Sequence, residues 1–409
     1  MRGVDEDGQV ASDGSATTCL QRSSTGYRHA SLGLFFAGLT SFSLIYCVQP
    51  LLPAFALSFE RSPAQASLAL SVTTGMLAVS IVLCGIFSGR LPRRGVMFGA
   101  MMIASACNLL AALPMQWEVL LLVRAVEGFA LGGVPAIAMT YLGEEIEPQS
   151  LGRAMGIYVA GTAFGAMVGR VGMGLLADLT SWQTAMAIMG LTGLVSAMAF
   201  WVLLPPSRRF AARKGQPLRQ HLTGWLEQLR RPALQRLFLV GFCLTSIFVT
   251  LFNYSVFRLT GTPFDLSQGA VSLIFLTFAF GIVSSSVGGT LVDRLGRRPM
   301  LVTGFALALL GVLATLSSQL PLVVLGISLV TTGFFIGHSA ASSSVSQAAG
   351  SNKGSASALY LLFYYLGSSL SGSAGGWFWS AAGWEAVAGF AAAFALLGIV
   401  LSAWPARRL

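Results

Sequence analysis

The chain has 409 residues, of which 55% are hydrophobic and only 10% charged, and its mean hydropathy is +0.73. About 25% of the residues of a soluble domain are charged, so this composition excludes a water-soluble surface and indicates an integral membrane protein. The formal net charge of +10 comes from basic residues scattered through short loops. No basic patch is interleaved with aromatic residues, which excludes a nucleic-acid-binding protein.

Residues 1–29 are polar and lack the apolar core of about 7–15 residues that a signal peptide needs, so we expect a disordered cytoplasmic tail. Twelve apolar stretches follow, each close to the ~20 residues with which a helix crosses a bilayer. They span 30–52, 66–88, 95–113, 118–142, 153–177, 183–204, 236–257, 268–291, 299–318, 321–342, 355–379 and 384–404. Strands are excluded because these stretches are too long and because backbone groups in lipid must be satisfied within each helix or a closed barrel.

The sequence therefore predicts an all-α membrane protein with twelve transmembrane helices in two pseudo-symmetric six-helix bundles. The predicted divisions are a bundle over 30–204, a cytoplasmic central loop over 205–235, a bundle over 236–404 and a cytoplasmic tail over 405–409. An internal repeat supports the two halves. The segment GTLVDRLGRRPM at 289–300 has a weaker copy, GIFSGRLPRRGV, that starts at Gly85. Gly165 and Gly367 recur at nearly the same offset, which indicates a duplication in parallel orientation.

The positions of Lys and Arg predict the orientation. With both termini in the cytoplasm, all but four of the 25 basic residues lie in the tails and cytoplasmic loops, as the positive-inside rule requires. The exceptions are Arg61 and Arg258, in outer loops, and Arg124 and Arg170, within helices.

The central loop contains apolar residues at helical spacing among basic ones, namely Leu218, Leu222, Trp225, Leu226 and Leu229. This pattern predicts a short amphipathic helix on the inner leaflet. A solvated linker is the alternative.

Three charged residues, Arg124, Glu127 and Arg170, fall inside the predicted helices. A charge inside a bilayer costs at least about 2.5–3.5 kcal/mol and is normally paired or functional. Glu127 follows Arg124 by three residues and shares its helix face. A rise of about 1.5 Å per residue puts all three in the outer half of the membrane, where we expect them to meet. Glu127 would then couple transport to protons, the excess positive charge would bind an anionic group, or a permanent ion pair would fix helix packing.

Other classes of protein lack their signatures here. No Gly-Lys-Ser/Thr of an ATP-driven pump occurs, and a channel would more naturally be an oligomer of fewer spans. The three histidines are scattered, so neither a nucleophile with its base nor a metal cluster indicates an enzyme. The five cysteines show no CxxC spacing, so neither disulfides nor a metal site are expected. We expect a carrier that is not an enzyme and has no cofactor.

Two six-helix halves with this repeated loop resemble the major facilitator superfamily, from residue 30 to residue 404. The family pattern is Gly-x-x-x-Asp-Arg-x-Gly-Arg-Arg/Lys. The C-terminal copy matches it with Gly289, Asp293, Arg294, Gly296, Arg297 and Arg298. The N-terminal copy keeps Gly85, Arg90, Arg93 and Arg94 but has Gly89 in place of the acid and Pro92 in place of the glycine. The resemblance implies a latch that holds the halves together on the cytoplasmic side when the outside is open.

The next cytoplasmic loop, GEEIEPQSLGR, offers Glu144 and Glu145 as substitutes for the acid that is absent at Gly89. Solvated surface acids are the alternative interpretation. Carboxylates and guanidiniums form charge-assisted hydrogen bonds, and these must break when the halves rock.

The fifth predicted helix has a glycine at every fourth position, Gly161, Gly165 and Gly169, so a neighbouring helix can approach closely. This run resembles the glycine motif of exporter branches of the superfamily, but Ala166 replaces its proline and Arg170 its last glycine. YCVQPLLPAF in the first helix and GAMVGR in the fifth look most like a bacterial inner-membrane subfamily of efflux permeases linked by name with acriflavine sensitivity.

The resemblance implies a monomeric secondary transporter in a bacterial cytoplasmic membrane, which moves a small molecule by alternating access. Proton-coupled efflux of a drug or a sugar-like solute is the leading expectation, and uptake or uniport of a small, anionic solute is the alternative. Helices 1, 4, 7 and 10 line the cavity in the family, which makes candidate contacts of Tyr46, Gln49, Asn253, Tyr254 and His338. We expect Tyr360, Tyr364 and Tyr365 to be packing or interface residues.

Overall fold

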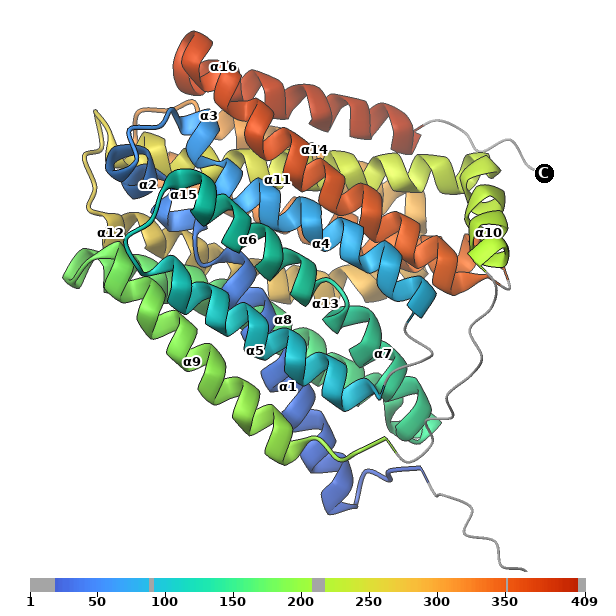
Figure 1. Ribbon diagram of the computed structural model, residues 1–409. Coiled ribbons are helices and arrows are strands. Elements are labelled where there is room, and N and C mark those ends of the chain that lie inside the picture. The colour runs from blue at the N-terminus through green and yellow to red at the C-terminus, as the bar shows by residue number, and fades with distance from the viewer. Residues whose placement is uncertain (1–18, 88–91, 208–217, 351, 404–409) are drawn as a thin grey trace, which may run out of the picture.

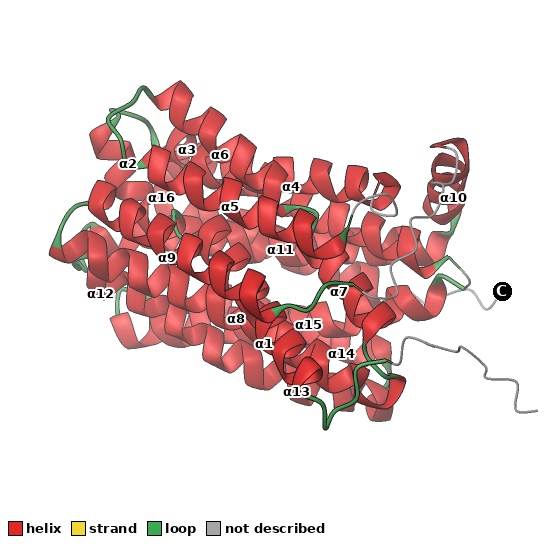
Figure 2. Cartoon of the chain, turned by 60° about the horizontal axis from the view of Figure 1, so that its bottom comes forward, coloured by secondary structure: helices red, strands yellow, loops and turns green. Residues whose placement is uncertain are grey.

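The computed structural model describes residues 19–87, 92–207, 218–350 and 352–403. In this part of the chain the regular elements are helices, and the one pairing of strand type is an isolated bridge between Leu20 and Ile146 (Figures 1 and 2). This confirms the predicted fold class.

The N-terminal bundle contains the first nine α-helices and one 3₁₀-helix. They are α1 (Thr25–Tyr46), η1 (Gln49–Leu51), α2 (Leu52–Ser58), α3 (Pro63–Ala66), α4 (Leu68–Phe87), α5 (Arg93–Ala111), α6 (Trp117–Leu131), α7 (Val134–Glu145), α8 (Pro148–Leu179) and α9 (Trp182–Leu203). Several of these are segments of one crossing: α6 and α7, for example, are separated only by Gly132 and Gly133, and together they cross once.

The C-terminal bundle follows a short helix of the central loop. Its elements are α10 (Leu218–Arg230) in that loop, then α11 (Pro232–Thr260), α12 (Gln268–Ser272), η2 (Leu273–Thr277), α13 (Phe278–Leu295), α14 (Arg297–Ala314), α15 (Leu320–Ala348) and α16 (Lys353–Ala403). Eleven helices of the described chain are long and apolar enough to cross a membrane. The last, α16, has 51 residues and is interrupted by non-helical backbone at Ala382 and Gly383. It therefore supplies two crossings, which gives the twelve that the sequence predicts.

The helix α10 confirms that part of the central loop is helical, as the apolar spacing predicts. Leu222 and Leu226 are exposed, whereas Trp225 and Leu229 pack against the apolar core. The location of α10 on a lipid leaflet stays a prediction.

The glycine face of α8 packs directly on α1. A Cβ atom added to Gly161 would lie 2.4 Å from the carbonyl oxygen of Phe35, and one added to Gly165 would lie 2.3 Å from that of Leu39. Ser43 Oγ donates a hydrogen bond of 2.9 Å to the Gly165 carbonyl. The absence of side chains at these positions lets the two backbones touch.

The same contact recurs in the C-terminal bundle between α11 and α16. A Cβ atom added to Gly367 would lie 2.5 Å from the carbonyl oxygen of Phe242. Ser246 Oγ donates a hydrogen bond of 3.5 Å to the Gly367 carbonyl. Helices 1 and 5 of one half therefore pair as helices 7 and 11 of the other half do, which is the pseudo-symmetry expected from the repeat.

The two bundles contact each other at the end that carries α2, α3 and α12, away from α10 (Figure 1). Ser267 Oγ donates to Asp178 Oδ2 at 2.9 Å, and Gln268 Nε2 donates to the Pro50 carbonyl at 3.1 Å. Between described residues, hydrogen bonds that join the bundles lie at this end or in the adjoining half of the membrane-spanning part. The bundles are thus closed together at one end.

Candidate functional site

The first membrane crossing is interrupted where α1 ends, and the buried charged residues lie beside this interruption. The helix α1 ends at Tyr46, and the chain continues through Cys47 and Val48 into the short 3₁₀-helix that contains Pro50. Carbonyl groups in the last turn of a helix lack intrahelical donors. Here the buried Arg124 side chain provides the missing donors. It donates from Nη1 to the Leu44 carbonyl at 3.4 Å and from Nη2 to the Ile45 carbonyl at 2.8 Å.

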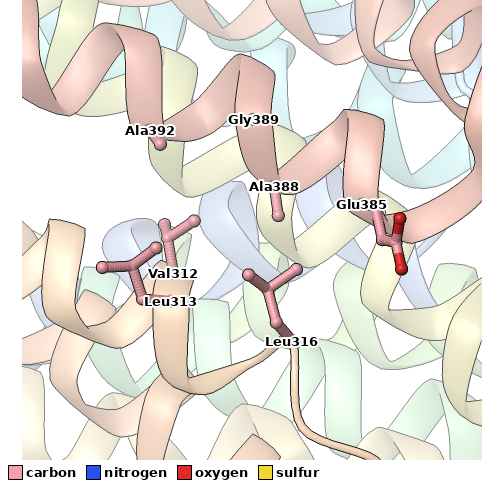
Figure 3. Close-up of a pocket in the computed structure, with 7 residues that line it drawn as sticks. All are labelled: Val312, Leu313, Leu316, Glu385, Ala388, Gly389 and Ala392. Carbon is pink, nitrogen blue, oxygen red and sulfur yellow. The ribbon is translucent and has the colours of Figure 1, made fainter.

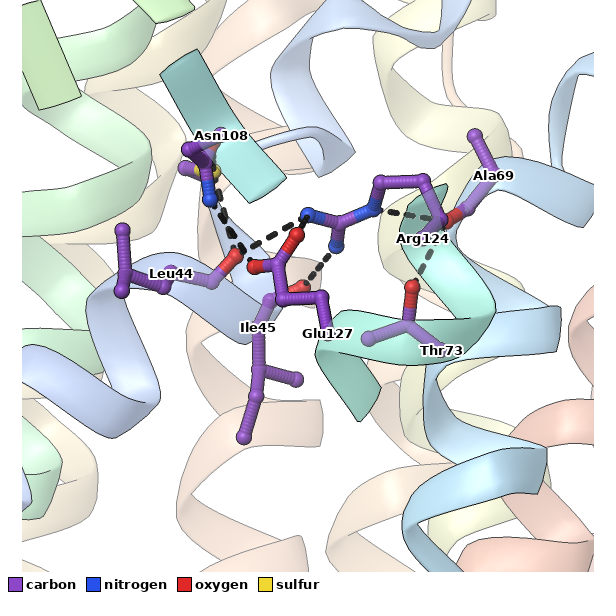
Figure 4. Close-up of polar contacts among 8 residues, drawn as sticks. Leu44, Ile45, Ala69, Thr73, Asn108, Arg124 and Glu127 are labelled. Carbon is purple, nitrogen blue, oxygen red and sulfur yellow. Dashed lines mark hydrogen bonds and ion pairs between the residues drawn. The ribbon is translucent and has the colours of Figure 1, made fainter. Parts of the chain in front are cut away.

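Arg124 also binds α4 and a second residue of its own helix, α6 (Figure 4). Its Nε donates to the Ala69 carbonyl of α4 at 3.2 Å. Its Nη1 lies 2.5 Å from Oε2 of Glu127, one turn further along α6. Both side chains are fully buried, so the predicted pairing on one helix face is present as a membrane-embedded ion pair.

Glu127 has a second partner that the sequence analysis did not identify. Asn108 of α5 donates from Nδ2 to Glu127 Oε1 at 2.9 Å, and its own Oδ1 lies 3.5 Å from the Cys47 thiol. Both carboxylate oxygens are thereby hydrogen-bonded. An asparagine within an apolar span is itself a signal, because polar groups in lipid need partners.

Arg170 does not join this pair, contrary to the expectation that the three charges meet. Its Nε donates to Gln49 Oε1 at 2.6 Å and its Nη1 to the carbonyl of Ala166 at 2.6 Å. Among described residues, no carboxylate lies within ion-pairing distance of it. Residue counting gives the height of a side chain along a helix but not its direction around the axis. Arg170 follows Gly169 on a helix whose glycine face meets α1, and it points toward α1 and the C-terminal bundle instead.

Aromatic rings surround the Arg170 guanidinium. Its central carbon lies 4.2 Å from the ring centre of Tyr46, 4.7 Å from that of Phe278 and 5.4 Å from that of Phe275. Rings of this kind attract a cation through their quadrupole. Since Phe275 and Phe278 belong to the C-terminal bundle, Arg170 reaches across the interface between the halves.

The candidate cavity residues separate into groups. Gln49 Nε2 donates to Asn253 Oδ1 at 2.7 Å, so Gln49 links Arg170 to the other bundle. Asn253 is fully buried, and its Nδ2 has no partner among described residues. The Tyr254 hydroxyl lies 2.7 Å from the Gly372 carbonyl oxygen of its own bundle and 3.3 Å from Ser67 Oγ of the N-terminal bundle.

His338 lies in a cluster of aromatic side chains. Its Nδ1 is 2.9 Å from the Tyr360 hydroxyl, its ring stacks on Phe334 at an angle of 4°, and its ring centre is 5.0 Å from that of Tyr364. Tyr360 and Tyr364 of α16 thus contact a half-buried histidine of α15, and their role as packing or interface residues stays a prediction.

The residues proposed for the latch are only partly described. Arg93 Nη2 lies 3.0 Å from Glu144 Oε1, which pairs the N-terminal copy with an acid in the last turn of α7. Arg94 stacks on Trp201 with 4.2 Å between its central carbon and the ring centre, and Glu145 is buried. In the C-terminal copy the side chains of Arg294, Arg297 and Arg298 are exposed. Arg90 and the side chain of Asp293 lie outside the described residues, as does the surrounding of Gly85.

A separate groove lies between α14 and the last crossing of α16 (Figure 3). It has a volume of about 280 Å³ and is lined by Val312, Leu313, Leu316, Glu385, Ala388, Gly389 and Ala392. None of the charged residues described above contributes to it.

The amino-acid sequence matches the model of the Major Facilitator Superfamily over residues 34–372 and 259–408. An uncharacterised MFS-type transporter of Bacillus subtilis (strain 168), YybF, is 43% identical over 392 residues, which cover 95% of this chain and 96% of the relative. The inner membrane transport protein YnfM of Escherichia coli (strain K12) is 40% identical over 390 residues, 95% of this chain and 93% of the relative.

Solved structures show the same fold. A bacterial homologue of the human lysosomal transporter Spinster, in an inward-facing and unoccupied conformation, superposes with a TM-score of 0.74 at 16% identity, over 93% of this chain and 95% of that one. The nucleoside transporter NupG has the same TM-score at 15% identity, over 91% of this chain and 99% of that one. This chain is therefore a multi-pass membrane transporter, not an enzyme, and it belongs to the Major Facilitator Superfamily.

Proposed function

We propose that the chain is a proton-coupled efflux transporter in which Glu127 takes up and releases the proton. The observation that carries this proposal is the fully buried Arg124–Glu127 pair, because Arg124 also holds the broken end of α1 and the backbone of α4. Protonation of the carboxylate would remove the negative charge that holds Arg124. The first crossing could then shift against the fourth, which would couple a proton to alternation between the two open states.

The proposal also covers the solute, the oligomeric state, the membrane and the cytoplasmic latch. The solute is a drug or a sugar-like molecule, and the protein acts as a monomer within the acriflavine-sensitivity type of efflux permeases. The membrane is the bacterial cytoplasmic membrane, with both termini in the cytoplasm. The distribution of Lys and Arg supports that orientation, and the relative YnfM is named an inner membrane transport protein. The basic loops act as the cytoplasmic latch, with Glu144 in place of the acid that is absent at Gly89, and the ion pair between Arg93 and Glu144 supports this role.

The test uses proteoliposomes that contain a pH-sensitive dye and have an acidic interior. Acriflavine and arabinose are added outside as probes, and both the dye signal and the probe concentration are followed. We expect one of them to enter as protons leave, with no proton movement in Glu127→Gln. Accumulation of a probe that is unaffected by collapse of the pH gradient would contradict proton coupling.

The second candidate is uptake or uniport of a small, anionic solute. It is favoured by the hydrogen bonds to both oxygens of Glu127, which suit a permanent ion pair. In that case the probe crosses only down its own gradient, and Glu127→Gln changes the stability of the protein rather than the pH dependence of transport.

A further inference from the structure

The Arg170 guanidinium carries a positive charge that is not balanced locally. It is 1% exposed, and among the described residues its bonds go to an amide oxygen and a backbone carbonyl. Its Nη2 makes no hydrogen bond to a described residue. A buried charge without a counter-charge is costly, and such a group in a membrane commonly marks a binding site.

Two further donors at this interface have no acceptor. The ring of Tyr46 lies against the guanidinium. Tyr364 belongs to a continuous series of packed rings that begins at Phe278 beside Arg170 and passes through Phe248 and Phe334. Neither tyrosine hydroxyl makes a hydrogen bond to a described residue. Donors from three helices, α1, α8 and α16, thus belong to one connected group of side chains at the interface between the bundles.

One of these donors, Tyr364, belongs to a cluster of aromatic rings. The ring centres of Tyr364 and His338 lie 5.0 Å apart with their planes at 51°, and both side chains are half-buried, so part of each remains accessible. The His338 ring is held parallel to Phe334, and Phe334 stacks on Phe248 with 4.1 Å between ring centres. Packed rings therefore hold this cluster in place. A substrate ring can lie face to face on one of the two rings and edge to face against the other.

We propose that Arg170, Tyr46, Tyr364 and His338 form the substrate site and that the substrate is a small aromatic anion. Its anionic group accepts hydrogen bonds from Arg170 and the tyrosine hydroxyls, and its ring lies against Tyr364 and His338. Charge-assisted hydrogen bonds to a guanidinium are short and directional, so the site would reject neutral analogues. This inference rests on the proposed function as a transporter, and it replaces the broad class of drug or sugar-like solutes by one chemistry.

The test measures equilibrium binding to the purified full-length protein in lipid nanodiscs. The probes are 2-naphthoate, 2-naphthamide without the charge, and cyclohexanecarboxylate without the aromatic ring. We expect 2-naphthoate to bind at least 10-fold more tightly than either analogue. Arg170→Gln should remove the preference for the acid over the amide, and Tyr364→Leu the preference for the aromatic ring. The exposed Arg153 of the same helix provides the control, and Arg153→Gln should bind as the original chain does.

Equal binding of 2-naphthoate and 2-naphthamide by the unaltered protein would overturn the proposal, and so would full binding by a folded Arg170→Gln. If Arg170→Gln does not fold, the comparison of the three probes on the unaltered protein still decides. Transport of acriflavine or arabinose without any binding of 2-naphthoate would preserve the proposed function and reject this site. Binding of 2-naphthoate without coupled proton movement would preserve this site and reject the proposed proton-coupled function.

Discussion

Arg124 and Glu127 form one ion pair, but their removal should have different consequences. The amide oxygen of Glu127→Gln can still accept a hydrogen bond from Arg124, and its NH2 group can donate to Asn108 Oδ1 once the Asn108 amide is turned over, so we expect a folded protein. It cannot change its charge, so proton-driven transport should be lost while exchange of solute between the two sides persists. Counterflow in proteoliposomes, with and without a pH gradient, measures both. Transport with an unchanged pH dependence would show that Glu127 does not couple the proton.

Arg124→Gln should instead destabilise the protein. Truncation leaves three backbone carbonyls of α1 and α4 with fewer donors, and it leaves the buried Glu127 carboxylate without a counter-charge. Breaking a buried pair in this way costs about 3–5 kcal/mol, so the thermal midpoint should fall well below that of Glu127→Gln. Fluorescence-detected size exclusion after heating compares the two variants. Equal midpoints would contradict the clamping role of Arg124.

The sequence is sufficient to predict the ion pair of Arg124 and Glu127, but it does not predict which other residues surround the pair. The spacing of Arg124 and Glu127 fixes their shared face, because the pitch of a helix is constant. The placement of Arg170 depends on how α8 is rotated against α1, which spacing alone does not determine. The bond from Asn108 to Glu127 does not follow from the sequence for the same reason, since Asn108 acquires this partner only from the helix opposite.

At the scale of helices, the contact between α1 and α8 tolerates no side chain at its centre. Gly165→Ala would place a methyl group 2.3 Å from the Leu39 carbonyl oxygen, so the helices must separate. Overpacking of this kind costs about 1–3 kcal/mol. Gly156 of the same helix has open space around it, so we expect Gly156→Ala to keep the thermal midpoint that Gly165→Ala lowers. The opposite order would contradict this packing.

The three glycines show what a periodic pattern can predict. Their fourfold spacing predicts a closely packed face on the fifth helix, and at all three positions the α1 backbone lies close to the glycine. The identity of the partner, α1, follows from three-dimensional topology. The twelve crossings are likewise predictable, because each depends only on the length of an apolar stretch.

The pair of Arg93 and Glu144 connects the start of α5 to the end of α7 within the N-terminal bundle. The Arg93 side chain is 7% exposed and that of Glu144 is 33% exposed. A pair that reaches water is worth up to about 1 kcal/mol, so we expect a double-mutant cycle with Arg93→Gln and Glu144→Gln to give a coupling energy of that size in unfolding. Transport rates in the same cycle test the latch, since a purely structural pair would leave turnover unchanged.

At the scale of the whole molecule, the end at which the bundles meet offers a position for a reversible disulfide cross-link between them. Ser267 of the C-terminal bundle bonds to Asp178 of the N-terminal bundle. In a background without the five native cysteines, Ser267→Cys with Asp178→Cys should form a disulfide that holds this end shut. Transport should stop on oxidation and return on reduction, while Ser267→Cys alone stays active under both conditions. Undiminished transport by fully cross-linked protein would show that this end need not open.

The membrane interior contains two described guanidiniums and one carboxylate, a surplus of one positive charge when Glu127 is ionised. A membrane voltage acts on that surplus. One elementary charge that crosses the whole field at 100 mV gains about 2.3 kcal/mol, so each tenth of the field through which Arg170 moves corresponds to about 0.2 kcal/mol. An inside-negative voltage would then bias the empty carrier toward the state in which Arg170 lies nearer the cytoplasm. A bound anion would neutralise the surplus and make the loaded carrier insensitive to voltage.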